Sequence, residues 1–234
     1  MLFLADINIG QLVDKYFNLK LALEFLPHLL NAAKIAVIFT LIGEFFGIVI
    51  GLFVSLARIS NVMILKYPAA FYVNLFCGTP LLVQLMFIYY ALPYVGINLP
   101  PALAGVIGLS LNSGAYVAEI FRAGILSIPK GQMEAARSLG MSYAQAMRYV
   151  IIPQAFRVVI PPLTNEFVAL LKDSSLLYVI QVPEIAYRMR SLASATFNAT
   201  SYTLAALIYL AMTIPLTYLA AYLEKRLSRY TSHA

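Results

Sequence analysis

The sequence predicts an all-α protein that crosses a membrane several times. Hydrophobic residues make up 62% of the 234 residues and charged residues only 11%, against about 25% charged residues in a typical soluble domain. The mean hydropathy of +0.83 agrees with this composition. Several apolar stretches also reach the roughly 20 residues that a helix needs to cross a bilayer. We therefore predict a polytopic bundle of five transmembrane helices.

A polar segment precedes the first span. Residues 1–25 include Asp6, Asp14 and Lys15 and lack the continuous apolar core of a cleaved signal peptide. We predict an amphipathic helix at the membrane interface, because apolar residues recur there at helical spacing. These residues are Leu12, Tyr16, Leu19 and Leu23.

Five spans make up a transmembrane domain of residues 26–230, and a tail of residues 231–234 follows it. Gly78 and Pro80 interrupt the second span. Pro161 and Pro162 interrupt the fourth span, and because proline removes a helical hydrogen bond, we predict a bend there. The five spans are residues 26–57, 65–94, 99–125, 150–171 and 202–223.

One segment after the fourth span is harder to place. Residues 175–190 are too short for a further span, and we interpret them as a half-buried helix outside the core.

Basic residues set the orientation, because Lys and Arg gather in cytoplasmic loops. With five spans, nine basic residues share one side and four share the other. We therefore predict an extracytoplasmic N-terminus and a cytoplasmic C-terminus. The nine are Arg58, Lys66, Arg122, Lys130, Arg137, Arg148, Lys225, Arg226 and Arg229; the four are Lys15, Lys20, Arg188 and Arg190.

Composition excludes several functions. The single cysteine, Cys77, rules out an internal disulfide and a multi-cysteine metal site, and the two histidines, His28 and His233, lie near opposite ends. No span pairs a nucleophile with a nearby base, which disfavours a membrane-embedded enzyme. The net charge of +6 is explained by cytoplasmic loops rather than nucleic acid. We expect no catalytic residue, metal or cofactor in this chain.

The loop before the fourth span, "EAARSLGMSYAQAMRYVIIP" (residues 134–153), is unusually polar. Its local signals predict a short surface helix that ends at Gly140, a residue suited to the left-handed position past a helix end. Ser142 and Gln145 predict a capping box that starts the next helix, which runs into the fourth span. We expect Met133, Ala136 and Leu139 to share one face. By pattern alone this is an ordinary interfacial helix.

The spacing resembles the EAA signature of ABC importer permeases, with conservative changes at residues 150 and 152. Three other segments resemble the polar amino acid uptake subfamily: "GTPLLVQL" (78–85), "YVAEIFRAGI" (116–125) and "LLKDSSLL" (170–177). The signature positions are Glu134, Ala135, Ala136, Gly140, Val150, Ile152 and Pro153.

This resemblance implies a type I ABC importer (MetI-like) fold in the bacterial or archaeal plasma membrane. It further implies that a coupling helix, residues 131–141, docks into a separate ATPase subunit, present in two copies, which holds ATP and Mg. A second permease chain and an extracytoplasmic binding protein complete the implied assembly. The chain itself has no Gly-x-x-x-x-Gly-Lys-Ser/Thr loop for nucleotide phosphates. The predicted ATPase-coupling residues are Glu134, Ala135, Ala136, Arg137, Leu139 and Gly140.

Polar residues at membrane depth are the candidates for substrate contact. At 1.5 Å per residue, polar groups of the third and fourth spans reach similar depths near mid-bilayer. We predict that Glu166 contacts a cationic amino acid, and the alternative is a structural carboxylate between spans. For Asp173, beside Lys172, a structural role leads. The full candidate set is Asn112, Ser113, Thr164, Asn165, Glu166 and Asp173.

Other charges in the spans have structural interpretations. Glu119 and Arg122 lie three residues apart, which predicts an ion pair. Gly43, Gly47 and Gly51 form a small-residue face for close helix packing, so packing is favoured over substrate contact for the neighbouring Glu44. Lys34 receives no role.

The substrate itself stays open between basic amino acids (arginine, lysine, histidine) and glutamine. Relatives carry an acidic residue and an arginine before Gly-Thr-Pro, where this chain has Asn74 and Cys77. Loss of that arginine favours a cationic substrate, although compensated drift also explains it. A self-contained secondary transporter or channel is the alternative function.

Overall fold

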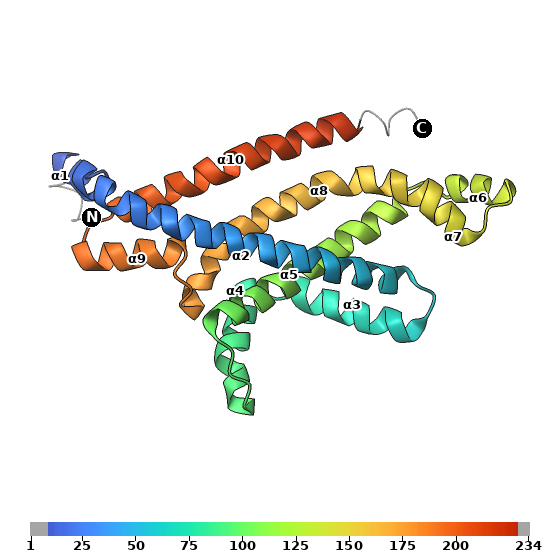
Figure 1. Ribbon diagram of the computed structural model, residues 1–234, viewed down its shortest axis with the longest axis horizontal. Helices are drawn as coiled ribbons and strands as arrows, with labels where there is room; N and C mark the ends of the chain where they lie inside the picture. The colour runs from blue at the N-terminus through green and yellow to red at the C-terminus, as the bar shows by residue number, and fades with distance from the viewer. Residues whose placement is uncertain (1–8, 229–234) are drawn as a thin grey trace, which may run out of the picture.

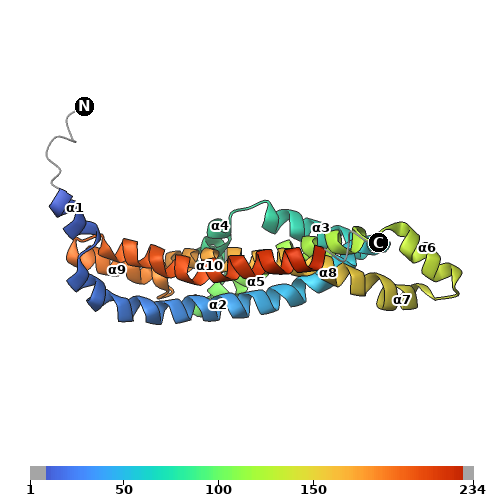
Figure 2. The same ribbon diagram turned by 90° about the horizontal axis from the view of Figure 1, so that it is seen from above.

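The computed structural model describes residues 9–228, and the elements of that range are all helical (Figure 1). Four long helices lie lengthwise along the molecule, and both views show them together (Figures 1 and 2). Asp6, Arg229 and the predicted tail, residues 231–234, fall outside the described residues. The long helices are α2 (Leu19–Ile59), α5 (Pro101–Leu126), α8 (Ile152–Asp173) and α10 (Thr200–Ser228).

The count of spans differs from the predicted five. Within residues 9–228, three helical stretches are long and apolar enough to cross a membrane, and a bent pair brings the total to four at most. The remaining long helix, α8, carries Gln154, Arg157 and Glu166 and is too polar to qualify by composition. A fifth span and the orientation of the termini stay predictions.

The predicted N-terminal helix is two helices rather than one. Helix α1 (Ile9–Tyr16) ends before Asn18, whose side chain caps α2 by accepting a hydrogen bond from the Leu21 N–H at 3.0 Å. A capping side chain satisfies a free N–H of the first turn, so α2 starts afresh at this point. The carbonyl of Lys15 accepts from the Ala199 N–H at 2.8 Å, which ties α1 to the start of α10.

The second predicted span is broken by a sharp elbow. Helix α3 (Met63–Cys77) and the segment Leu81–Val95, which begins with α4 (Leu81–Met86), meet at 103°. Beyond α4 the chain continues through a π-helical turn and a 3₁₀ turn and leaves the bundle sideways as an arm (Figure 1). Gly78 and Pro80 lie at the break, as the interruption in the sequence indicated.

The fourth predicted span is not broken at its prolines. Helix α8 runs without interruption across Pro161 and Pro162. The φ of proline is compatible with a helix, and α8 packs against α5 and α10. The prolines therefore do not interrupt the helix, and the predicted bend stays a prediction.

The segment of residues 175–190 is also more deeply buried than predicted. It forms a 3₁₀ helix (Ser174–Ile180) and the start of α9 (Ile185–Thr196). Leu177 and Ile180 are fully buried in one apolar cluster with Leu109 of α5, and Ile185 is fully buried in a second cluster with α2 and α10. The prediction of a helix outside the core is wrong, because the apolar residues of this segment fill the space between the long helices.

A glycine seam brings α2 and α5 into close contact. A Cβ atom at Gly47 would lie 2.4 Å from the Ser113 Oγ, and one at Gly51 would lie 2.6 Å from a Val117 methyl carbon. Side chains at these positions would therefore push the helices apart. The predicted small-residue face is confirmed as a packing surface.

Candidate functional site

The predicted surface helix is present as α6 (Lys130–Ser138), and its end has the expected chemistry. Gly140 has φ +84°, a left-handed conformation that glycine adopts without strain. The N–H of Gly140 donates to the Arg137 carbonyl at 3.0 Å, and that of Met141 donates to the Ala136 carbonyl at 3.2 Å. This pair of bonds is a Schellman motif, which fixes the direction in which the chain leaves α6.

The predicted capping box starts the next helix, α7 (Tyr143–Ala146). The Gln145 N–H donates to the Ser142 hydroxyl at 3.3 Å, and the Ser142 N–H donates to the Gln145 side chain at 2.8 Å. A π-helical turn (Met147–Ile151) then joins α7 to α8. Since only three residues separate α5 from α6, this element is attached to two long helices of the bundle.

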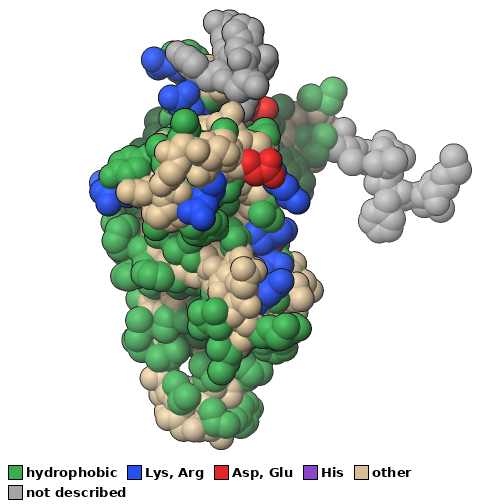
Figure 3. Space-filling model, turned by 90° about the vertical axis from the view of Figure 1, so that its right-hand side faces the viewer, with side chains coloured by type: hydrophobic (Ala, Val, Ile, Leu, Met, Phe, Trp, Pro, Cys, Tyr) green, Lys and Arg blue, Asp and Glu red, His purple; other side chains and the backbone are tan. Residues whose placement is uncertain are grey.

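Most of α6 is exposed. Ala136 is buried and Met133 half-buried, whereas Leu139 is 82% exposed. The reason is that Leu139 caps the helix and its backbone has already left helical geometry. Figure 3 faces this end of the molecule and shows Lys and Arg side chains gathered on it. The exposed charged residues of this region are Lys130, Glu134, Arg137 and Arg148.

The polar residues predicted to converge near mid-bilayer separate into distinct contacts. Asn112, buried on α5, donates from Nδ2 to the Gln84 Oε1 at 3.0 Å. Gln84 in turn donates from Nε2 to the carbonyls of Phe76 and Thr79, at 2.9 and 3.0 Å, and to the Thr79 hydroxyl at 2.9 Å. Gln84 therefore bridges the elbow and α5. Its role rests on a contact between residues 28 apart, which helical spacing does not reveal.

The second contact joins α5 to α2. The Ser113 hydroxyl donates to the Glu44 Oε2 at 2.9 Å, and both side chains are buried. The close approach at Gly47 brings the two helices within reach of this bond. The predicted structural interpretation of Glu44 is supported, because its carboxylate is engaged between two helices.

Within residues 9–228, the polar residues of α8 are not hydrogen-bonded to these pairs. The Thr164 hydroxyl donates to the Ile160 carbonyl of its own helix at 3.0 Å, and Asn165 is exposed. Glu166 is partly buried, and the charges of Glu44 and Asp173 act on it. Among the described residues, no hydrogen bond joins the polar residues of α5 to these three. Asp173, the other carboxylate of the predicted set, is likewise partly buried.

The predicted ion pair between Glu119 and Arg122 is confirmed. The Arg122 Nη2 lies 2.8 Å from the Glu119 Oε2. Arg58 of α2 forms a second ion pair with the same carboxylate. Spacing along one helix predicts the first partner, whereas the second comes from another helix and has no local signal. One carboxylate therefore ties two helices together.

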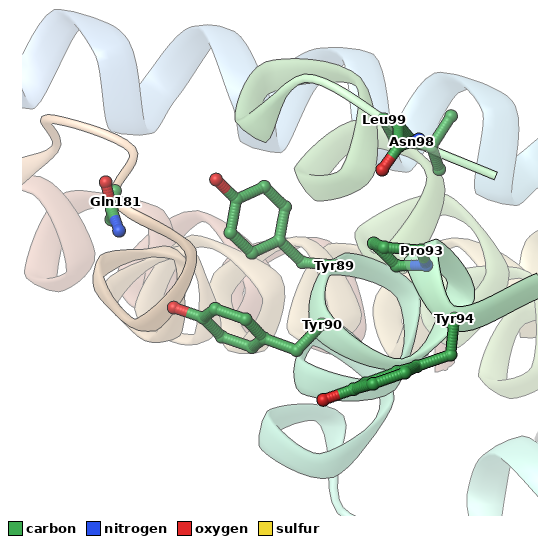
Figure 4. A pocket seen from close by; sticks show the side chains of 7 residues that line it. All are labelled: Tyr89, Tyr90, Pro93, Tyr94, Asn98, Leu99 and Gln181. Carbon is green, nitrogen blue, oxygen red and sulfur yellow. The ribbon is translucent and has the colours of Figure 1, made fainter. Parts of the chain in front are cut away.

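A polar hollow of about 520 Å³ lies beside the arm (Figure 4). Tyrosine rings and two carboxamide side chains line it, and no charged residue contributes. The Tyr90 hydroxyl donates to the Val179 carbonyl at 2.7 Å, which anchors the arm to the 3₁₀ helix. The lining residues are Tyr89, Tyr90, Pro93, Tyr94, Asn98, Leu99 and Gln181.

Three other residues discussed in the sequence analysis are exposed or partly buried. Lys34 is exposed and donates to the Asn31 side chain at 3.3 Å. Asn74 is exposed and Cys77 is partly buried, both in α3 near the elbow. Within residues 9–228, no group of three or more His, Cys, Asp or Glu side chains is arranged to hold a metal ion.

Comparisons with known proteins agree with this geometry. Residues 47–229 match the family described as "Binding-protein-dependent transport system inner membrane component". A probable amino-acid ABC transporter permease protein of Bacillus subtilis, YckA, is 43% identical over 92% of this chain and 95% of its own length. The glutamine transport system permease GlnP of Escherichia coli is 38% identical over 86% of this chain and 94% of its own length.

Structural similarity points to the same family. The crystal structure of an amino acid ABC transporter with histidines superimposes with a TM-score of 0.83 at 38% identity, covering 95% of this chain and all of that one. This similarity confirms the ABC importer permease fold that the EAA-type signature predicted. The chain belongs to the family of binding-protein-dependent transport system inner membrane components.

Proposed function

We propose that the chain is the permease subunit of an ATP-driven, binding-protein-dependent importer for polar amino acids. The observation that carries the proposal is the α6 element, with its Schellman motif, its capping box and its attachment to both α5 and α8. Such an element keeps a defined shape while most of its surface stays exposed, as a docking element must.

The proposed assembly contains two ATPase subunits, a second permease chain and a solute-binding protein on the extracytoplasmic side. ATP and Mg belong to the ATPase subunits. In the proposed orientation the α6 end is cytoplasmic, and movement of the ATPase displaces α6 and thereby the two long helices attached to it. The proposed docking residues are Glu134, Ala135, Ala136, Arg137, Leu139 and Gly140.

For the substrate we propose a basic amino acid or glutamine. Glu166 is the proposed contact for a cationic side chain, because a carboxylate is costly at membrane depth unless it is used. Thr164, Asn165 and Asp173 are proposed around it on α8. Asn112 and Ser113 remain proposed contacts on α5, each engaged with a neighbouring helix in the present arrangement.

Reconstitution tests the function. Proteoliposomes with the chain, its ATPase and a loaded binding protein should take up amino acid only when ATP is present. Omitting the ATPase is the matched control. Substrate flux by this chain alone, without ATP or partners, would establish the alternative, a secondary transporter or channel.

Substitution of Glu166 tests the substrate class. Glu166→Gln removes a negative charge with little change in shape, so uptake of a cationic amino acid should fall more than uptake of glutamine. Glu24→Gln, the same exchange at an exposed carboxylate outside the proposed site, serves as the control. Equal losses for both substrates would refute a role of Glu166 in recognising charge.

A further inference from the structure

The side chain of Gln84 connects the two sides of the elbow between α3 and α4. The break leaves backbone carbonyls without helical partners, and such groups are costly to leave unpaired inside a membrane. The Nε2 of Gln84 donates to two of them, on Phe76 and Thr79. Gln84 is also only 8% exposed, so water does not readily replace these bonds.

The same side chain reaches α5. After its amide nitrogen has donated to the elbow, the oxygen of Gln84 accepts from the Asn112 Nδ2 at 3.0 Å. Because the two ends of one carboxamide hold different elements, the elbow and α5 are connected by two consecutive hydrogen bonds. A second contact also holds α4 against α5, because the side chain of Leu85 occupies the space beside Gly108.

The connection extends to the docking element. Helix α5 ends at Leu126, and α6 begins at Lys130. A rigid helix carries a displacement of its end along its length, so movement of α6 shifts Asn112, and Asn112 holds Gln84. The arm lies beyond the elbow, and it is anchored again by Tyr90 to the 3₁₀ helix after α8.

We propose that the contact between Gln84 and Asn112 is the link through which α5 positions the elbow, so that the elbow moves with the docking element during the transport cycle. Gln84 is a positioning residue in this proposal. The proposal rests on the proposed function, because it needs an ATPase that moves α6.

Chemical modification of Cys77 can report this movement of the elbow. Cys77 is its single cysteine, lies at the last residue of α3 beside the elbow, and is partly exposed. In the intact complex, the rate at which N-ethylmaleimide modifies Cys77 can be measured by mass spectrometry of this chain. Comparing nucleotide-free and vanadate-trapped complexes, without substrate, then reports whether the elbow responds to the ATPase.

The informative variant is Asn112→Leu. It removes the link to α5 but leaves the bonds from Gln84 to the elbow carbonyls in place. We expect a several-fold difference in the Cys77 modification rate between the two states of the wild-type complex, and equal rates in Asn112→Leu. Asn112→Ala, which adds no bulk, is the second variant should the leucine prevent assembly. Ser110→Ala is the matched control, since Ser110 is buried on α5 but bonds only within that helix.

Each outcome decides the proposal. Equal rates in both states of the wild type would overturn it, as would a wild-type difference that persists in both Asn112 variants or disappears in Ser110→Ala. ATP-driven uptake is measured in the same vesicles. A wild-type complex that transports although its Cys77 modification rate does not change would refute the proposed link and leave the proposed function standing. A wild-type complex without ATP-driven uptake defeats the proposed function itself.

Discussion

The two ends of the helix bundle satisfy their polar groups in different ways. At the α9 end, residues 184–201, the key side chain is Glu184, which is completely buried. Its carboxylate accepts from the N–H groups of Ala186 and Tyr187, at 2.7 and 2.8 Å, and from the Tyr209 hydroxyl of α10 at 3.3 Å. The buried carboxylate of Glu184 therefore finds all these hydrogen-bond donors within the chain.

At the α6 end, residues 130–146, the Schellman motif and the capping box also fix the backbone conformation, but most side chains are exposed. Only Ala136 and Ala146 are buried there, and Glu134 is exposed. A surface with a fixed shape and few internal contacts does not stabilise the fold much by itself. The difference agrees with the proposed function, in which the α9 end supports the bundle and the α6 end docks a partner.

The largest expected effect comes from a substitution at Gly140 that disturbs the backbone at the end of α6. A valine at position 140 must adopt a left-handed conformation at a cost of roughly 1–2 kcal/mol, and its branched side chain makes this worse. Gly140→Val should therefore displace α6 and reduce ATP-driven uptake about tenfold or more, while the thermal stability of the bundle stays unchanged. Gly140→Asn is the control, because asparagine tolerates this conformation. Normal uptake by the valine variant would contradict the docking role.

A smaller effect, on stability instead, is expected at the α9 end. Glu184→Ala leaves one buried and one partly buried N–H group, those of Ala186 and Tyr187, without their acceptor, which should cost about 2 kcal/mol of stability. Thermal unfolding in detergent measures the loss. Glu134→Ala is the matched substitution at the other end, and it should leave stability unchanged but weaken binding of the ATPase. If both variants lost stability equally, the contrast between the ends would not hold.

The smallest expected effect concerns the capping box. Ser142→Ala removes one cap bond of α7, worth about 1 kcal/mol locally. We expect a modest drop in uptake and little change in unfolding temperature, with Ser142→Asp restoring both. An unfolding temperature that falls as far as in Glu184→Ala would show that the α6 end supports the fold after all.

Local chemistry explains how much of this could be predicted. The end of α6 at Gly140, the capping box at Ser142 and the pair of Glu119 and Arg122 all depend on residues within a few positions of each other. Apolar length likewise predicted α5 and α10 closely.

Contacts between distant residues could not be predicted in this way. Gln84 meets Asn112, Glu44 meets Ser113, and Arg58 meets Glu119 only because the helices pack in one particular arrangement. The 103° elbow has a local cause at Gly78 and Pro80, but its angle is set by what α4 packs against. Depth likewise could not predict which polar residues form hydrogen bonds, since depth alone does not give the rotation of each helix.

Cross-linking at the two ends tests the central claim most directly. Leu139 and Phe197 are both large, apolar and highly exposed, at 82% and 94%, and lie at opposite ends. A photoreactive benzoyl-phenylalanine in place of each, in the intact importer, should capture the ATPase from position 139 and not from position 197. Capture of the ATPase from position 197, or none from position 139, would contradict the claim that α6 is the docking element.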